Sequence, residues 1–166
     1  MLKLRDTSTL KEVTQKKMTE YQKYFMLRSK GGYSNCLDRG SGNVLPNCVG
    51  YAWGCLFYFH GQRKDAATWN KRPRCDANGI YEACKKNGSG FWVSKELKED
   101  SIACFNVGAN GHVVYVHYKM PNGQWLCSES NYSGTVSNGK YIRYLVTTNP
   151  KVLYKNYQGC VYDFTK

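Results

Sequence analysis

The chain has 166 residues, 42% of them hydrophobic and 14% aromatic, and its 24 Lys and Arg outnumber its 12 Asp and Glu to give a formal charge of +12. A chain of this length and apolar content forms one domain with a sizeable core, which excludes a disordered protein. The charge favours anionic partners, but the basic residues are scattered and match no nucleic-acid-binding motif. We therefore expect no specific nucleic-acid binding.

No run of the sequence is long and apolar enough to span a membrane, and the opening Met1–Asp6 lacks the apolar core of a signal peptide. We therefore expect that the protein is made in the cytoplasm and does not insert into a membrane. The eight cysteines include no C-x-x-C pair and no histidine at zinc-finger spacing, and Asp38 has no second carboxylate near it. The sequence therefore predicts no metal and no cofactor, with thiols that stay reduced in the cytoplasm.

Residues 1–30 are predicted to form an N-terminal extension that packs on the domain as a short helix. Within it, Ser8–Gln22 carries apolar residues at roughly helical spacing among lysines and glutamates. We expect a short strand at Tyr24–Leu27. The following Gly31–Pro46 is rich in Gly, Ser, Asn and Asp, which indicates an irregular loop.

The stretch around Cys48 has the pattern of a helix start. Pro46 breaks regular structure, Asn47 is a favoured helix cap, and an apolar run follows from Val49 to Phe59. Cys48 then lies in the first turn, where unpaired N–H groups and the positive end of the helix dipole favour a thiolate. The common alternative is a buried, unreactive cysteine, so the assignment of Cys48 as a nucleophile depends on its partners.

Downstream of the Cys48 helix, the pattern changes from helices to strands. Two short helices are predicted at Ala66–Asn70 and Asn78–Lys86, the second closed by Asn87-Gly88. After Gly90 the alternation predicts strands at Ser101–Asn106, Gly111–Tyr118 and Gln124–Asn131, with a C-terminal pair within Lys140–Thr147 and Gly159–Phe164. Met120-Pro121-Asn122-Gly123 is typical of a hairpin turn.

This hairpin brings polar residues of two strands to one face. A turn symmetric about the bond between residues 121 and 122 places His112 opposite Asn131 and Val114 opposite Glu129. The side chains of His112, Glu129 and Asn131 then point the same way at one end of the sheet. His117 points to the opposite face and His60 lies near the far end of the Cys48 helix, so we interpret both as structural.

A cysteine at a helix start, a histidine at a strand start and a carboxylate with an amide on the next strand form the set that thiol hydrolases use. The histidine takes the thiol proton and later protonates the leaving amine. A carboxylate or amide on its other nitrogen fixes the tautomer and stabilises the imidazolium. The predicted catalytic residues are therefore Cys48, His112, Glu129 and Asn131.

Three blocks of the sequence resemble the CHAP domain, the cysteine, histidine-dependent amidohydrolase/peptidase, as found in bacteriophage lysins. They are Asn-Cys-Val-Gly-Tyr-Ala-Trp-Gly at 47–54, Gly-His-Val-Val-Tyr-Val at 111–116 and Ser-Glu-Ser-Asn-Tyr at 128–132. The resemblance implies a catalytic domain over residues 31–166, with a papain-like α+β fold related to NlpC/P60 peptidases. Its N-terminal helices would pack on an antiparallel sheet of about five or six strands. By the same resemblance Cys48 is the nucleophile, His112 the base, Glu129 the residue that orients His112, and Asn131 a further polar member.

The resemblance also implies hydrolysis of peptidoglycan from Gram-positive bacteria, whose anionic walls would attract a basic chain. The bond is either the amide joining muramic acid to L-alanine or a peptide bond of the stem or cross-bridge. The enzyme would be made in the bacterial host cytoplasm and act at the wall after release or on a virion, as a monomer or within a larger modular lysin.

Two alternatives remain at this stage. An NlpC/P60 peptidase also pairs a thiol with a histidine, but its third residue typically follows soon after the histidine, so Glu129 and Asn131 on the next strand favour CHAP. A non-catalytic wall-binding module, or one associated with virions or conjugation, would tolerate the loss of Cys48.

Overall fold

The computed structural model describes residues 26–29, 32–35, 47–59, 72–73, 75–87, 90–130 and 142–163. The predicted helices Ser8–Gln22 and Ala66–Asn70 lie outside these ranges, as do Asp38, His60 and Asn131. None of the helices in the described ranges combines the length and apolarity needed to cross a bilayer.

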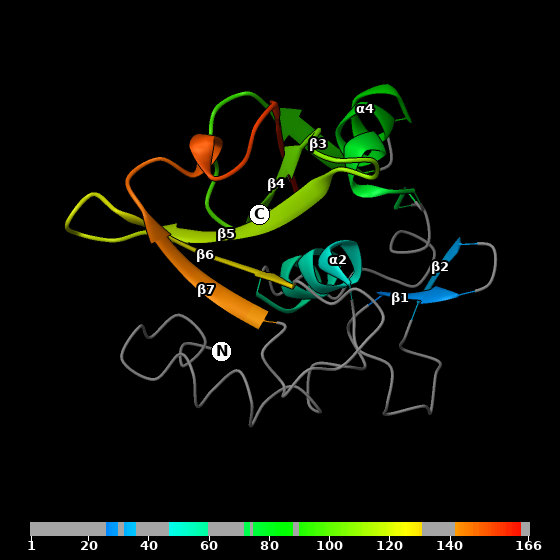
Figure 1. Cartoon of the computed structure of the whole chain (residues 1–166), viewed down its shortest axis with the longest axis horizontal. Helices are drawn as coiled ribbons and strands as arrows, with labels where there is room; N and C mark the ends of the chain where they lie inside the picture. The colour runs from blue at the N-terminus through cyan, green and yellow to red at the C-terminus, as the bar shows by residue number, and fades with distance from the viewer. Residues whose placement is uncertain are drawn as a thin grey trace.

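A six-stranded antiparallel sheet forms the centre of the described structure, in the order β3-β8-β4-β5-β6-β7 (Figure 1). Its strands are β3 (Phe91–Ser94), β4 (Ser101–Phe105), β5 (His112–Lys119), β6 (Trp125–Ser130), β7 (Ile142–Thr147) and β8 (Tyr157–Asp163). Strands β4 to β7 are neighbours in chain order, whereas β8 returns to pair between β3 and β4. The five strands predicted after Gly90 are confirmed. The sixth, β3, was not predicted because it is a four-residue edge strand, too short for a clear alternation.

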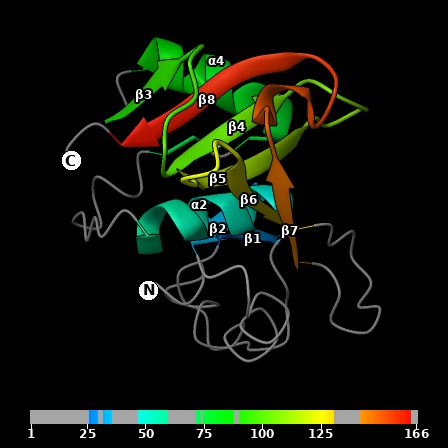
Figure 2. The ribbon, with the colours of Figure 1, turned by 90° about the vertical axis from the view of Figure 1, so that its left-hand side faces the viewer.

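Two helices and a small hairpin accompany the sheet. Helix α2 (Cys48–Phe59) packs along β5 and β6, and α4 (Ala77–Asn87) packs against β3, β4 and β8. Strands β1 (Met26–Ser29) and β2 (Gly32–Asn35) pair with each other beside α2 (Figure 2). Helices packed on an antiparallel sheet confirm the predicted α+β class.

The hairpin β1–β2 corrects one expectation. The stretch from Gly31 was predicted to be an irregular loop, but Gly32–Asn35 is a strand whose residues pair with Met26–Ser29. Turn-forming residue types were overridden here by backbone pairing with a neighbouring strand, which single-residue preferences do not register. The boundary predicted at residue 30 falls between these two paired strands.

Both faces of the central strands are buried. All five residues of β4 are buried because one face packs against α2 and α4 while the other packs against a segment that contains the short 3-10 helix η4 (Pro150–Val152). Figure 1 shows α2 and η4 on opposite sides of β5 and β6. The first face carries Cys104, Val113 and Tyr115, and the second carries Ala103, Phe105, Val114 and Val116. The alternation predicted for β5 therefore assigns the residues from Val113 to Val116 to the correct faces of the sheet.

The register between β5 and β6 matches the prediction away from the turn and departs from it near the turn. Tyr115 opposes Ser128 and Val116 opposes Cys127, as a turn symmetric about residues 121 and 122 requires. Beyond Val116 the register shifts by one residue, so that Tyr118 opposes Leu126. The prediction of a fully symmetric hairpin is wrong there, because one additional residue on β5, His117, forms a bulge. The bulge lies on the turn side of the pairs that position His112 and Glu129.

Candidate active site

Helix α2 places Cys48 at its first residue. The Asn47 side-chain oxygen accepts a hydrogen bond of 2.9 Å from the Gly50 backbone N–H, which caps the helix as predicted. Val49, Ala52, Trp53 and Leu56 are buried at helical spacing and hold α2 on the sheet. Cys48 is partly buried at the edge of this core and lies at the positive end of the helix dipole.

The start of β5 positions His112 beside α4. The preceding residue, Gly111, has a φ of 75°, and a Cβ built on it would lie 2.5 Å from the backbone nitrogen of Asn78. That nitrogen donates a hydrogen bond of 3.0 Å to the carbonyl of Asn110, so the loop before β5 is docked on the first turn of α4. Only glycine fits at this approach, and His112 follows directly from it.

His112 and Glu129 form a direct ion pair between β5 and β6. The Nε2 atom of His112 donates to the Oε2 atom of Glu129 over 2.7 Å. The Glu129 side chain is fully buried, whereas the His112 side chain is 15% exposed. A buried carboxylate requires compensating hydrogen bonds and positive charge, and the imidazole provides both when it is protonated.

His112 also contacts the thiol of Cys48, which links the two halves of the site. Burial lowers the pKa of His112, but side-chain hydrogen bonds with Cys48 and Glu129, together with the negative charges of both groups, raise this pKa to about 9 from its ordinary 6.5. Because Glu129 occupies Nε2, Nδ1 is the ring nitrogen left for the sulfur of Cys48. The imidazole is therefore charged at neutral pH, between the sulfur of Cys48 and the carboxylate of Glu129.

A fourth side chain, Tyr154, completes the cluster and was not predicted from the sequence. Its hydroxyl donates to both carboxylate oxygens of Glu129, at 2.8 Å from Oε1 and 2.7 Å from Oε2. Its ring lies edge-on to the His112 ring, with centroids 4.6 Å apart. Tyr154 lies between η4 and β8, and no local sequence pattern connects that segment to β6.

The family model described as the CHAP domain matches residues 38–131, more than half of the chain. The chain belongs to the CHAP domain family. CHAP domains are generally cysteine- and histidine-dependent amidohydrolases or peptidases, so the chain is identified as an enzyme of this kind. The predicted family is thereby confirmed, and the six-stranded sheet with α2 is consistent with its papain-like α+β fold. No curated protein matches the chain.

The matched range of the CHAP domain contains three of the predicted site residues that the structure brings together, Cys48, His112 and Glu129. The fourth, Asn131, lies outside the described residues, so its place in the site stays a prediction. Tyr154 lies beyond the matched range.

His117 and Cys127 lie on the same two strands as His112 and Glu129, but their surroundings give them no comparable reactivity. His117 is fully buried and its Nε2 hydrogen-bonds to the hydroxyl of Ser128 over 2.6 Å. None of the seven cysteines in the described ranges forms a disulfide. Burial, together with the charge of Glu129, raises the pKa of Cys127 to about 12, which makes that thiol unreactive. Across the same ranges, no group of three or more His, Cys, Asp and Glu side chains is arranged to hold a metal ion.

Proposed function

We propose that this CHAP domain hydrolyses peptidoglycan by attack of the Cys48 thiolate on an amide carbonyl. One observation carries the proposal: the unbroken sequence of contacts from Cys48 through His112 to the buried carboxylate of Glu129. The bond is either the amide between N-acetylmuramic acid and L-alanine or a peptide bond of the stem or cross-bridge.

The first half of the reaction forms a thioester. The sulfur of Cys48 bonds to the carbonyl carbon, and the developing oxyanion accepts a hydrogen bond from the backbone N–H of Cys48 at the start of α2. The His112 imidazolium then gives its proton to the nitrogen of the leaving amine as the carbon–nitrogen bond breaks. A pKa of about 9 keeps this proton available at neutral pH.

The second half regenerates the thiolate. Neutral His112 removes a proton from water, and the resulting hydroxide attacks the thioester carbon. The carbon–sulfur bond breaks, the product leaves as a carboxylic acid, and the imidazolium again faces a thiolate. Glu129 acts through His112 in both halves, because it fixes the ring orientation and balances the positive charge.

Charge supports a polyanionic substrate. The formal net charge of +12 would concentrate the protein on the anionic wall of Gram-positive bacteria, and this attraction would weaken as salt is added. The lysin setting predicted from the sequence is part of the proposal and is tested by adding the protein to whole Gram-positive cells and following turbidity.

The test of the proposed function is digestion of purified Gram-positive peptidoglycan, with the fragments identified by mass spectrometry. The wild type is compared with Cys48→Ala and with Cys75→Ala, a matched control that removes another partly buried thiol. Burial raises the pKa of Cys75, and the charge of Asp76 raises it further, so the control should keep full activity.

The new chain ends identify the bond. Free L-alanine amino groups would establish an amidase, and other new peptide ends would establish an endopeptidase. Cleavage that survives in Cys48→Ala would refute the thiol mechanism. No cleavage by the wild type on walls from several species would favour the non-catalytic wall-binding module.

A further inference from the structure

Tyr154 contacts both partners of the His112–Glu129 pair. Its hydroxyl lies within 2.8 Å of each carboxylate oxygen of Glu129, so its single proton is shared between them. Its ring packs edge-on against the imidazole at a centroid distance of 4.6 Å and an interplanar angle of 61°. One side chain therefore restrains the carboxylate through its hydroxyl and the imidazole through its ring.

The ring of Tyr154 is itself held in place. It also packs edge-on against Phe105, which is fully buried in β4, with centroids 5.5 Å apart. Tyr157 packs on the same phenylalanine at 5.6 Å. The position of Tyr154 is thus set by the sheet and not by the loop alone.

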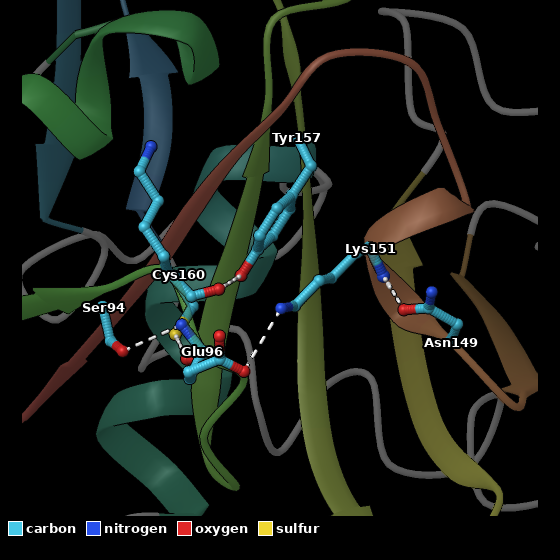
Figure 3. A network of polar contacts seen from close by, with 7 residues as sticks. Ser94, Glu96, Asn149, Lys151, Tyr157 and Cys160 are labelled. Carbon is cyan, nitrogen blue, oxygen red and sulfur yellow. Dashed lines mark hydrogen bonds and ion pairs between the residues drawn. The ribbon is translucent and has the colours of Figure 1, made fainter.

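The segment that carries Tyr154 is tied down at both ends. On one side, the Asn149 side chain accepts from the backbone N–H of Lys151 over 3.1 Å, and Lys151 pairs with Glu96 at 3.3 Å (Figure 3). On the other side, Asn156 and Asn106 exchange two hydrogen bonds, of 2.9 and 3.1 Å. The ion pair contributes little, but the three hydrogen bonds each engage a backbone group and fix the path of the segment.

We propose that Tyr154 is a positioning residue of the candidate active site, whose hydroxyl holds the Glu129 carboxylate in the orientation that His112 requires. The proposal rests on the proposed function. Tyr154 would act through Glu129 and His112, the two site residues that its hydroxyl and its ring contact. It lies outside residues 38–131, so the family match assigns it no role.

The consequence is a change in the pKa of His112 when the hydroxyl is removed. Glu129 raises this pKa through its hydrogen bond and its charge, and Cys48 raises it from the other side. Cys127 on β6 also lies within the field of Glu129, and Arg143 on β7 is its register partner. If Tyr154 holds the carboxylate against His112, Tyr154→Phe weakens the contribution of Glu129 and lowers the pKa of His112.

The test is an NMR titration of the imidazole signals in the full chain, which needs no substrate. The chain has three histidines, and His112→Ala assigns the signal. Tyr154→Phe removes the hydroxyl and preserves the packing of the aromatic ring against His112 and Phe105. Tyr157→Phe is the matched control, because it removes a nearby tyrosine hydroxyl that bonds to the Lys95 carbonyl at 3.3 Å and to the side chain of Cys160, neither of which belongs to the candidate site.

We expect Tyr154→Phe to lower the pKa of His112 by about one pH unit, and kcat on peptidoglycan roughly tenfold with little change in KM. Tyr157→Phe should match the wild type in both. In a Glu129→Gln background, adding Tyr154→Phe should have little further effect, because the hydroxyl acts through the carboxylate.

Three results would overturn the proposal. An unchanged pKa of His112 would leave Tyr154 with a packing role only. A higher pKa would show that the hydroxyl competes with His112 for the carboxylate instead of holding it. Fully additive losses in the double variant would show that Tyr154 acts independently of Glu129. A wild type that cleaves no wall, but whose His112 titration responds to Tyr154→Phe as expected, would refute the substrate and retain the positioning role.

Discussion

Strands β5 and β6 carry two histidine clusters, one on each face of the sheet, and the two are built from similar parts. In one, His112 bonds to Glu129 and Glu129 to the hydroxyl of Tyr154. In the other, His117 bonds to Ser128, whose hydroxyl lies 2.8 Å from that of Tyr51 on α2. Each cluster thus joins a histidine of β5 to an oxygen of β6 and then to a tyrosine from outside the sheet.

The two clusters differ in solvent exposure and in the presence of a thiol. His117 and Ser128 are completely buried, and their contact with Tyr51 ties α2 to the sheet. His112 begins its strand, stays partly exposed and meets Cys48. A buried hydrogen-bonded histidine is a structural feature, whereas one that joins a partly exposed thiol to a buried carboxylate can transfer protons.

The largest expected loss of activity comes from removing the two side chains of the first cluster that take part in the reaction directly. Cys48→Ala removes the nucleophile and His112→Ala removes the proton carrier, so each should reduce peptidoglycan hydrolysis by at least about a thousandfold. Both should keep the wild-type fold by circular dichroism, because neither side chain belongs to the fully buried core. Normal turnover by either variant would refute the assignment.

A smaller loss is expected when the orienting residue is removed. Glu129→Ala should leave an enzyme weakened roughly 100-fold, because thiol and imidazole remain but the ring loses its partner. Its pH profile should change as well, since Glu129 contributes to the raised pKa of His112. Initial rates measured across pH on one wall preparation test both effects, and an unaltered profile would contradict the role given to Glu129.

The pKa of His112 predicts how activity depends on pH. Its imidazolium persists well above the ordinary 6.5, so kcat/KM should decline only as pH rises through about 9. Because the folded-state pKa is raised, its contribution to stability is complete below 6.5 and is lost as pH rises through about 9. Urea unfolding followed between these limits checks the second expectation. A decline in activity already centred near 6.5 would mean that the contacts with Cys48 and Glu129 do not persist in solution.

The smallest effect on catalysis is expected from the second cluster. Ser128→Ala leaves His117 and the Tyr51 hydroxyl without their shared partner, which should lower the free energy of unfolding by about 1–3 kcal/mol. Hydrolysis per folded molecule should match the wild type. Thermal unfolding measures the loss of stability, and hydrolysis rates taken at temperatures below the unfolding transition measure the activity per folded molecule. Ser128 and Glu129 are adjacent in sequence. A loss of stability alone in Ser128→Ala and a loss of activity in Glu129→Ala would therefore show that the two faces of the sheet have different roles.

Local sequence patterns were enough to predict the helix and the strands that carry three of the site residues. The cap at Asn47 and the apolar run after it predicted the helix that carries Cys48, and alternation predicted the strands that carry His112 and Glu129. These predictions rest on periodicities of a few residues, which the backbone geometry of helices and strands imposes directly. The bulge at His117 leaves the predicted register intact for Tyr115 with Ser128 and for Val116 with Cys127, because it lies between these pairs and the turn.

Features that depend on pairing or packing with another segment could not be predicted from the sequence. Strand β3 exists because it pairs with β8, about seventy residues later. Strand β2 is a different case, because its partner β1 lies only a few residues before it, and there backbone pairing outweighs a turn-forming composition. Tyr154 reaches Glu129 only because the segment between β7 and β8 folds back over the sheet onto Phe105. The sequence was therefore sufficient for the family, the α+β class and three members of the candidate site. The fourth member and the separation of the two histidine clusters by burial emerged only in the folded chain, because both depend on packing between residues that no short-range pattern connects.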